Sequence, residues 1–237
     1  MKYRSIIFSL CMLLLIACNK QPTDFKVHYA GALKTMMSGN LDATVSLDSL
    51  SRKRNIYALG AFENLKGEIQ IFDGMPSNSI VNGEEVEIYN SFDARAALLV
   101  WTQVPEWIAI EIPSTVKNQS ELEKFISKQA ADSGLDVEKP FPFLLEGKTT
   151  GLDWHVIDWL DGDMVHTHEK HKEAGLNGSL ENAEVDILGF YSTKHQAIFT
   201  HHTTFMHMHF KTKDGDLAGH VDTINLNGNI QLKLPRQ

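Results

Sequence analysis

The most regular pattern of apolar and polar positions lies near the C-terminus, where Met-His-Met-His-Phe occupies residues 206–210. Alternation with a period of two predicts a β-strand that turns His207 and His209 to one face and the apolar residues to the other. Asp214-Gly215 follows, and Asp-Gly between two such runs is the strongest short-range signal for a β-hairpin. With these two residues at the centre of the turn, equal steps outward bring His209 directly opposite His220.

The N-terminal half contains one predicted helix and several predicted strands. Apolar residues at near-helical spacing, followed by Gly39, predict a helix over residues 25–38. Alternating or apolar runs bounded by turn residues predict strands at 57–62, 67–72, 94–101 and 107–112, and a hairpin over 79–89. In the strand at 67–72, Glu68 and Gln70 face one side, and Ile69 and Ile71 the other.

The C-terminal half shows one amphipathic helix and a series of strands. Ser120, with Glu123 three residues on, predicts the N-terminal cap of a helix over residues 120–131. Residues 161–178 are polar and histidine-rich, which predicts a long loop or lid. The predicted strands of this half lie at 141–146, 153–159, 185–192, 197–210 and 217–226.

These elements predict an α+β fold with mixed or antiparallel sheets in both halves and helices that cover them. We place the N-terminal α+β half at residues 25–115 and the β-rich half at residues 116–237. The histidine-bearing hairpin lies in the second half, which is therefore expected to carry the metal site.

The first residues read as an export signal rather than as part of the fold. Lys2 and Arg4 precede an apolar run, residues 6–16, that is too short to span a bilayer comfortably. The run ends in Leu-Ile-Ala-Cys18, which resembles the bacterial lipobox, so we expect a lipoprotein signal peptide at 1–17 and a lipidated Cys18. An ordinary signal peptide with a chance cysteine is the alternative. Residues 18–24 then form a tether, and the lipid alone holds the exported protein to the membrane, on its periplasmic or cell-surface side.

Composition narrows the chemistry further. The chain has two cysteines, Cys11 and Cys18, so a chain that begins at Cys18 has no disulfide and no thiolate metal ligand in its fold. The formal net charge is −8, and it becomes −10 without Lys2 and Arg4. An acidic protein of this kind is a poor candidate for binding nucleic acid.

His207, His209 and His220 are the candidate metal ligands. Directly opposed residues in a hairpin share a face, so three imidazoles converge on one patch and leave further coordination positions open, as in catalytic zinc sites. The alternative is a set of unrelated surface histidines, because His-x-His alone is a weak signal. A β-bulge at Ala218-Gly219 would also turn His220 away.

Several motifs together resemble those of the acetolactate decarboxylases. They are the Leu-Gly-Ala-Phe run at 59–62, Lys-Gly-Glu-Ile at 66–69, Asp73-Gly74, Leu-Gly-Phe-Tyr-Ser at 188–192, His-Met-His-Phe at 207–210 and Ala-Gly-His-Val at 218–221. The resemblance implies a zinc-dependent carboxy-lyase that converts 2-acetolactate to acetoin and carbon dioxide. It implies His207, His209 and His220 as zinc ligands and Glu68 as the glutamate near the metal.

The chemistry of such a reaction suits these residue types. Removing carbon dioxide from a hydroxy-keto acid leaves an electron pair, and a metal chelated by the hydroxyl and keto oxygens stabilises the resulting enediolate. A carboxyl group beside the metal, such as that of Glu68, can then act as ligand or deliver a proton. The alternative for Glu68 is a solvated strand residue next to Gly67. Zinc is preferred, although imidazole also suits copper, nickel and iron.

Two departures from the family leave the substrate open. The family carries an arginine for the substrate carboxylate in a strand after the central helix, whereas the corresponding segment here, residues 152–159, has none. The family's C-terminal extension, with a further glutamate, has no counterpart before Gln237.

The loop 165–172 offers other polar groups. His166, His168 and His171 either supply substrate-binding or proton-donating groups with the neighbouring lysines, or form a second metal site, or are chance surface histidines.

Two functions therefore remain at this stage. The first is a zinc-dependent lyase acting on a small hydroxy-keto acid. The second is a non-catalytic, metal-binding surface lipoprotein with a degenerate active site. The oligomeric state stays open, with a homodimer as one candidate.

Overall fold

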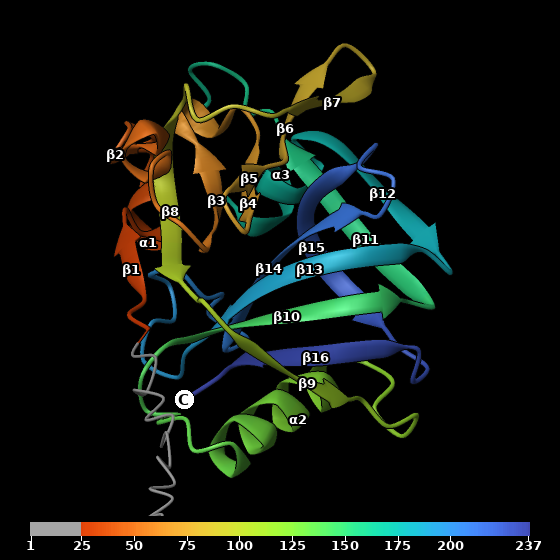
Figure 1. Ribbon diagram of the computed structural model, residues 1–237. Coiled ribbons are helices and arrows are strands. Elements are labelled where there is room, and N and C mark those ends of the chain that lie inside the picture. The colour runs from red at the N-terminus through yellow and green to blue at the C-terminus, as the bar shows by residue number, and fades with distance from the viewer. Residues whose placement is uncertain (1–24) are drawn as a thin grey trace, which may run out of the picture.

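The computed structural model describes residues 25–237, the side chain of His168 excepted, and has an α+β fold with two large sheets (Figure 1). Every pair of neighbouring strands in these sheets is antiparallel. The first sheet has the order β1-β8-β3-β4-β6-β7, with β2 on β8 and β5 on β4. Its strands are β1 (His28–Ala30), β2 (Val45–Ser46), β3 (Ile56–Phe62), β4 (Glu68–Phe72), β5 (Met75–Pro76), β6 (Asn78–Asn82), β7 (Glu85–Tyr89) and β8 (Arg95–Gln103).

The second sheet has the order β12-β11-β15-β14-β13-β10-β16-β9. Its strands are β9 (Trp107–Glu111), β10 (Phe141–Lys148), β11 (Gly151–Ile157), β12 (Gly175–Glu181), β13 (Glu184–Tyr191), β14 (Met206–Thr212), β15 (Ala218–Asn225) and β16 (Ile230–Pro235). The chain passes between the sheets after β8, so β9 pairs with β16 in the second sheet, although the sequence placed it in the half at 25–115. The sequence also missed β16.

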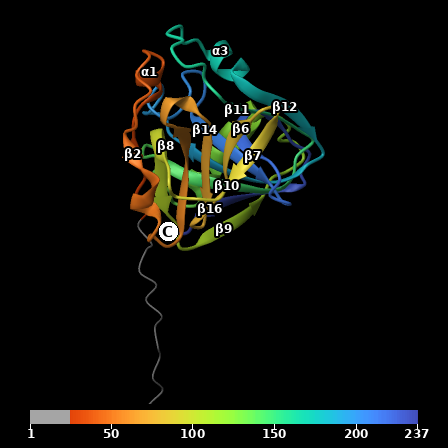
Figure 2. The ribbon, with the colours of Figure 1, turned by 90° about the horizontal axis from the view of Figure 1, so that it is seen from above.

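The helices are short except for one. They are α1 (Leu33–Met36), α2 (Gln119–Asp132) and α3 (His168–Glu173), with the 3-10 turns η1 (Leu47–Leu50) and η2 (Glu63–Leu65). Helix α2 matches the predicted amphipathic helix, but its cap is Asn118, whose side chain accepts a hydrogen bond from the backbone N–H of Glu121. In Figure 2, α1 and α3 lie on the same side of the molecule.

Three hydrophobic clusters hold these layers together. One fills the space between the second sheet and α2, and it contains the apolar face of β14, Met206, Met208 and Phe210. A second lies between the two sheets and joins β3 and β8 to β10 and β13. The third covers the other face of the first sheet and contains Ile69 and Ile71 of β4. The opposite face of β4, with Glu68 and Gln70, is thereby turned toward the second sheet.

Three predicted elements differ from the structure. Residues 25–38 are not one helix, because β1 pairs with β8 and only Leu33–Met36 is helical. Gly31 separates them at φ 79°, and a Cβ there would lie 2.0 Å from the carbonyl oxygen of Ala97. The strand predicted at 197–210 begins only at Met206. The long polar segment 161–178 is not entirely loop, since it contains α3 and the start of β12.

The expected signal peptide at 1–17, Cys18 and the tether at 18–24 lie outside the described residues. From residue 25 onward, no helix is long and apolar enough to cross a membrane.

Candidate metal centre

The hairpin formed by β14 and β15 has the predicted register. His209 pairs directly with His220, and the pairing continues without a bulge through Phe210 with Gly219 and Lys211 with Ala218. Gly215 adopts φ 82° in the turn, where glycine is tolerated without strain. A Cβ on Gly219 would lie 2.7 Å from the carbonyl oxygen of His155, so glycine at this position lets β11 approach the hairpin closely.

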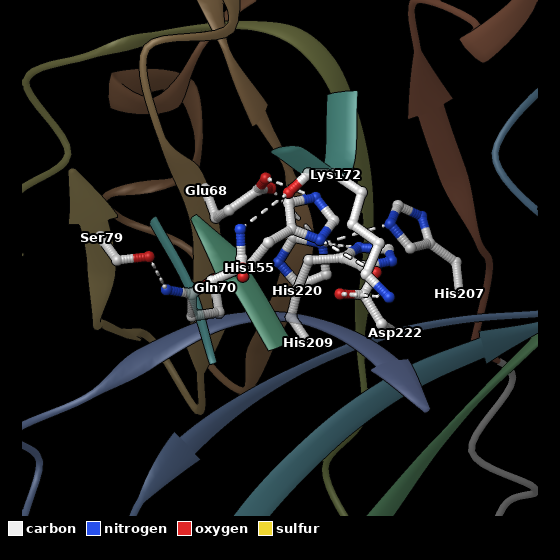
Figure 3. A network of polar contacts seen from close by, with 10 residues as sticks. Glu68, Gln70, Ser79, His155, Lys172, His207, His209, His220 and Asp222 are labelled. Carbon is white, nitrogen blue, oxygen red and sulfur yellow. Dashed lines mark hydrogen bonds and ion pairs between the residues drawn. The ribbon is translucent and has the colours of Figure 1, made fainter. Parts of the chain in front are cut away.

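Three ring nitrogens meet on the face of this hairpin that is turned toward β4 (Figure 3). Nε2 of His209 lies 3.1 Å from Nε2 of His207 and 3.4 Å from Nδ1 of His220. Tetrahedral zinc with bonds of about 2.0–2.1 Å places neighbouring ligand nitrogens about 3.3 Å apart. The spacing of these three nitrogens therefore fits a metal with at least one position left for a guest.

Burial keeps these histidines in the neutral form that binds metal. His209 is fully buried and His207 is 8% exposed, while His220 is partly accessible from the cavity. Burial lowers the pKa of His207 to about 3. Burial and the neighbouring imidazoles likewise hold the pKa values of His209 and His220 well below the usual value. All three rings are unprotonated at neutral pH.

Gln70 of β4 fixes the orientation of the His209 ring. The Gln70 amide nitrogen donates to the carbonyl oxygen of Ser77 at 2.6 Å and to Oγ of Ser79 at 3.1 Å. Its amide oxygen, 3.0 Å from Nδ1 of His209, therefore accepts the proton on that nitrogen. Nε2 of His209 is left free to face the metal position, the arrangement in which a neighbouring group selects the tautomer of a ligand.

Glu68, from the same face of β4, reaches the metal position from the opposite sheet. Its side chain is buried, with Oε2 3.8 Å from Nε2 of His209 and Oε1 3.7 Å from Nε2 of His155. Burial raises the pKa of Glu68 to about 8, against the opposing influence of His155. Glu68 is therefore a buried carboxyl group and not the solvated strand residue of the alternative reading.

His155 and Asp222 also belong to this cluster, and the sequence analysis did not assign them. His155 of β11 pairs with His220 of β15, and its Nδ1 lies 3.0 Å from Oδ1 of Asp222. Burial lowers the pKa of His155, but the hydrogen bond to Asp222 and the charge of Glu68 outweigh it, so the pKa is raised. His155, His220 and Asp222 form a second group whose ligand atoms are close enough to hold a metal.

Asp222 owes its position to a β-bulge. Trp154 pairs with Val221 and Asp153 with Thr223, which leaves Asp222 as the extra residue of β15. No pattern in the sequence indicates this bulge. No sequence pattern linked His155 to the site either, because its partner His220 lies in a segment far away in the chain.

The histidines of the segment 165–172 lie at the edge of the site. His166 stacks on Trp159, with ring centres 4.4 Å apart, and its Nδ1 is 2.8 Å from Nε2 of His171. His171 and Lys172 of α3 line the cavity, and Lys172 Nζ is 3.8 Å from Oδ2 of Asp222. His168 begins α3, and its side chain is outside the description. Among the described residues, the groups close enough to hold a metal include neither His166 nor His171.

A cavity of about 400 Å³ opens beside the three histidines. Glu68, His155, His207 and His220 line one part of it. Apolar residues from α1, η2, β3, β8 and β11 line another part, and these are Leu33, Met36, Met37, Ala61, Leu65, Leu98 and Ile157. The site therefore combines a buried group of histidines that could hold a metal, a carboxyl group and space for a small organic molecule.

Comparison with known proteins gives one family and several solved structures. The family model described as alpha-acetolactate decarboxylase matches residues 27–236. No sequence among the curated proteins matches the chain.

Two similar structures are of acetolactate decarboxylase from Bacillus subtilis. One, from strain 168, has 15% identity and a TM-score of 0.69, and the match covers 89% of this chain and 86% of that one. The other, from subspecies spizizenii, has 18% identity, a TM-score of 0.70 and the same coverage. A third, from Staphylococcus aureus, is a protein of unknown function similar to alpha-acetolactate decarboxylase, with 14% identity, a TM-score of 0.69 and coverage of 89% and 85%. At these sequence identities, the similarity to the three structures shows a shared fold.

Proposed function

Because the chain belongs to the alpha-acetolactate decarboxylase family, we propose that it is a metal-dependent lyase that releases carbon dioxide from a small hydroxy-keto acid, with zinc as its metal. The observation that carries this proposal is the meeting of three neutral imidazole nitrogens, 3.1 and 3.4 Å apart, with the buried Glu68 in one cavity. The metal ligands proposed are His207, His209 and His220.

When bound, zinc supplies a Lewis acid that polarises the hydroxyl and keto oxygens of the acid. The bond between the carboxylate and the neighbouring carbon breaks, its electron pair remains on the organic fragment, and that fragment must take up one proton. Glu68 lies beside the metal position, with Oε2 3.8 Å from Nε2 of His209, and is the residue that we assign to deliver this proton. Gln70 and Asp222 orient the rings of His209 and His155 around the reacting molecule.

Lys172 is the cation that we assign to the carboxylate of the substrate. β11 carries no arginine, and its His155 lines the cavity. Lys172 lines the same cavity from α3, and its ammonium group is 3.8 Å from Asp222. This develops the expectation that the histidine- and lysine-rich segment supplies positive groups, with His171 as the histidine that reaches the cavity.

The test is metal content and turnover on one preparation of the purified protein. Zinc-loaded protein is expected to release carbon dioxide and acetoin from racemic 2-acetolactate, and a chelator is expected to stop the reaction. Glu68→Gln should keep the zinc and lower the rate about 10²–10⁴-fold, the usual range for loss of a proton donor. Glu87→Gln, at an exposed position of β7, is the matched control. Zinc-replete protein that turns over neither acetolactate nor its ethyl homologue would remove the decarboxylase proposal.

A second candidate function is metal binding without turnover. The second group, His155 with His220 and Asp222, favours it, because it offers ligands beyond the three-histidine set. Calorimetric titration with zinc separates the two. A single tight zinc per chain, lost in His209→Ala, supports the enzyme, whereas a second tight zinc that depends on Asp222, with no turnover, supports the binding protein.

We also propose that the protein is exported and held to the membrane by a lipid on Cys18. The basis is the lipobox-like sequence Leu-Ile-Ala-Cys18 after the short apolar run. Cells that express the chain and are fed a labelled fatty acid should incorporate label into the protein, and Cys18→Ser should abolish it. Label that persists in Cys18→Ser contradicts the anchor.

A further inference from the structure

The cavity beside the metal position is amphipathic. Its polar lining includes Glu68, His155, His207 and His220, and also Lys34, Lys172 and His202. The remaining wall is apolar, and most of it is buried, with Met36 4%, Leu65 1%, Leu98 1% and Ile157 3% exposed. We call the part lined by Leu33, Met36, Ala61, Leu65, Leu98 and Ile157 the apolar arm. These residues belong to, or pack against, the hydrophobic cluster between the two sheets, and they line the cavity.

The apolar arm is built by segments that the fold holds in place. Helix α1, which contributes Leu33 and Met36, is tied down by hydrogen bonds from the backbone N–H groups of Leu33 and Lys34 to the carbonyl oxygens of Ile198 and Ala197. Ala61 and Leu98 come from the directly paired strands β3 and β8. Met36 adds an adaptable side chain of the kind that suits irregular apolar ligands.

The volume of the cavity exceeds what 2-acetolactate requires. That acid has nine non-hydrogen atoms, and at no more than about 30 Å³ for each, the share of a water molecule in the liquid, it fills less than about 270 Å³. Its apolar part consists of two methyl groups. The cavity of about 400 Å³ then has room for on the order of four further carbon atoms next to apolar walls.

We propose that the substrate of this site is a hydroxy-keto acid with an apolar substituent about four carbons longer than that of acetolactate, whose oxygens face the metal position while the substituent lies in the apolar arm. This rests on the proposed function and names its substrate class. Burial of each added methylene group is worth about 0.8 kcal/mol, which corresponds to about a fourfold gain in affinity.

The experiment measures binding apart from turnover. Linear alkyl hydroxamates chelate zinc through two oxygens, and they are titrated by calorimetry into the zinc-loaded protein in a series from acetohydroxamate to octanohydroxamate. Affinity should rise about fourfold per methylene over roughly the first four added carbons and then level off. In Ala61→Leu, which fills the apolar arm, the rise should stop earlier while zinc content and acetohydroxamate binding are kept. Met75→Leu, at an exposed position outside the cavity, should retain the full series.

The outcomes separate this inference from the proposed function. Tight binding of acetohydroxamate with no gain along the wild-type series overturns the longer substrate and leaves the lyase proposal standing. Failure to bind zinc or any hydroxamate overturns both. In a parallel activity assay, kcat/KM is expected to rise from 2-acetolactate to homologues with longer alkyl groups. A fall along that series in the wild-type protein counts against the apolar arm as a substrate site.

Discussion

At the scale of single residues, the site depends on groups that never touch a substrate. The side chain of Gln70 has one amide orientation that satisfies Ser77 and Ser79, and that orientation forces its oxygen to accept the Nδ1 proton of His209. Gln70, a residue of the first sheet, thus sets the tautomer of His209, a proposed metal ligand in the second sheet. The sequence placed Gln70 on the same face as Glu68 but gave no reason to link it to a histidine 139 positions away.

Replacing Gln70 tests this link. Gln70→Leu removes the acceptor, so Nδ1 of the buried His209 loses its partner and the ring is free to adopt either tautomer. Zinc affinity is expected to fall about 10–100-fold, as is usual for groups that orient a metal ligand. Competition with a fluorescent chelator measures the change. Gln103→Leu, at an exposed position of β8, is the control, and an unchanged affinity in Gln70→Leu would show that Gln70 does not set the tautomer.

Asp153 shows how one carboxylate can tie three strands together. It pairs with Ser179 of β12 on one side and Thr223 of β15 on the other, and it accepts hydrogen bonds from both hydroxyl groups, at 2.5 and 2.6 Å. These bonds lower its pKa from the ordinary value of 3.8. A carboxyl group whose pKa is depressed in the folded state stabilises the fold above its unfolded pKa, and that contribution is lost as the pH falls through the folded value.

Asp153→Asn is therefore expected to be less stable than wild type at neutral pH, by less than about 1 kcal/mol because the carboxylate is partly exposed to solvent. The difference should shrink below about pH 4 and vanish once the wild-type carboxyl is protonated. Urea unfolding followed by circular dichroism across this range measures it. Asp216→Asn, in the exposed turn after β14, is the control substitution. A constant difference for Asp153→Asn across this pH range would argue against the charge as its cause.

At the scale of elements, local pattern was informative where a strand pairs with its neighbour in sequence. The Asp214-Gly215 turn fixed the β14–β15 register because the two strands are contiguous. The helix predicted at 25–38 was wrong because the conformation of this segment depends on β8, a strand distant in the chain. Its apolar residues do pack against the cluster between the sheets, as the helical spacing implied, but β8 offers an edge on which His28–Ala30 pairs as a strand. The sequence pattern indicated that this segment is buried against the core, but it did not indicate that part of the segment forms a strand.

The contact of β3 with β8 makes a related prediction. Gly60 lies where a Cβ would come within 2.0 Å of the carbonyl oxygen of Leu98, a backbone atom that cannot move aside cheaply. Gly60→Ala is therefore expected to lose about 1–3 kcal/mol of the free energy of unfolding, the usual cost of overpacking. Gly151→Ala, whose Cβ would meet its nearest atom at an ordinary 3.4 Å, is the control. Equal stability of the two variants in urea would contradict the close approach.

At the scale of the whole molecule, the candidate site is shared between sheets that are far apart in sequence. The three predicted ligands come from one hairpin of the second sheet, and the sequence was sufficient to group them. Glu68 and Gln70 come from the first sheet, and His155 comes from a third strand of the second. These residues meet only because the two sheets stack, and no spacing within the sequence indicates that stacking. Glu68 was therefore placed at the site by the resemblance to the acetolactate decarboxylases and not by its sequence pattern.

Metal binding should consequently stabilise the entire fold. A ligand that binds only the folded chain, at about a thousandfold its Kd, adds about 4 kcal/mol, which for a domain of this size raises Tm by about 8–16 °C. Zinc is expected to produce a shift of this order, and a chelator to reverse it. His209→Ala should abolish the shift because it removes the central ligand, while His28→Ala, on the exposed part of β1, should keep it. A zinc-dependent shift of equal size in His209→Ala would mean that the stabilising metal does not depend on the fully buried imidazole between His207 and Gln70.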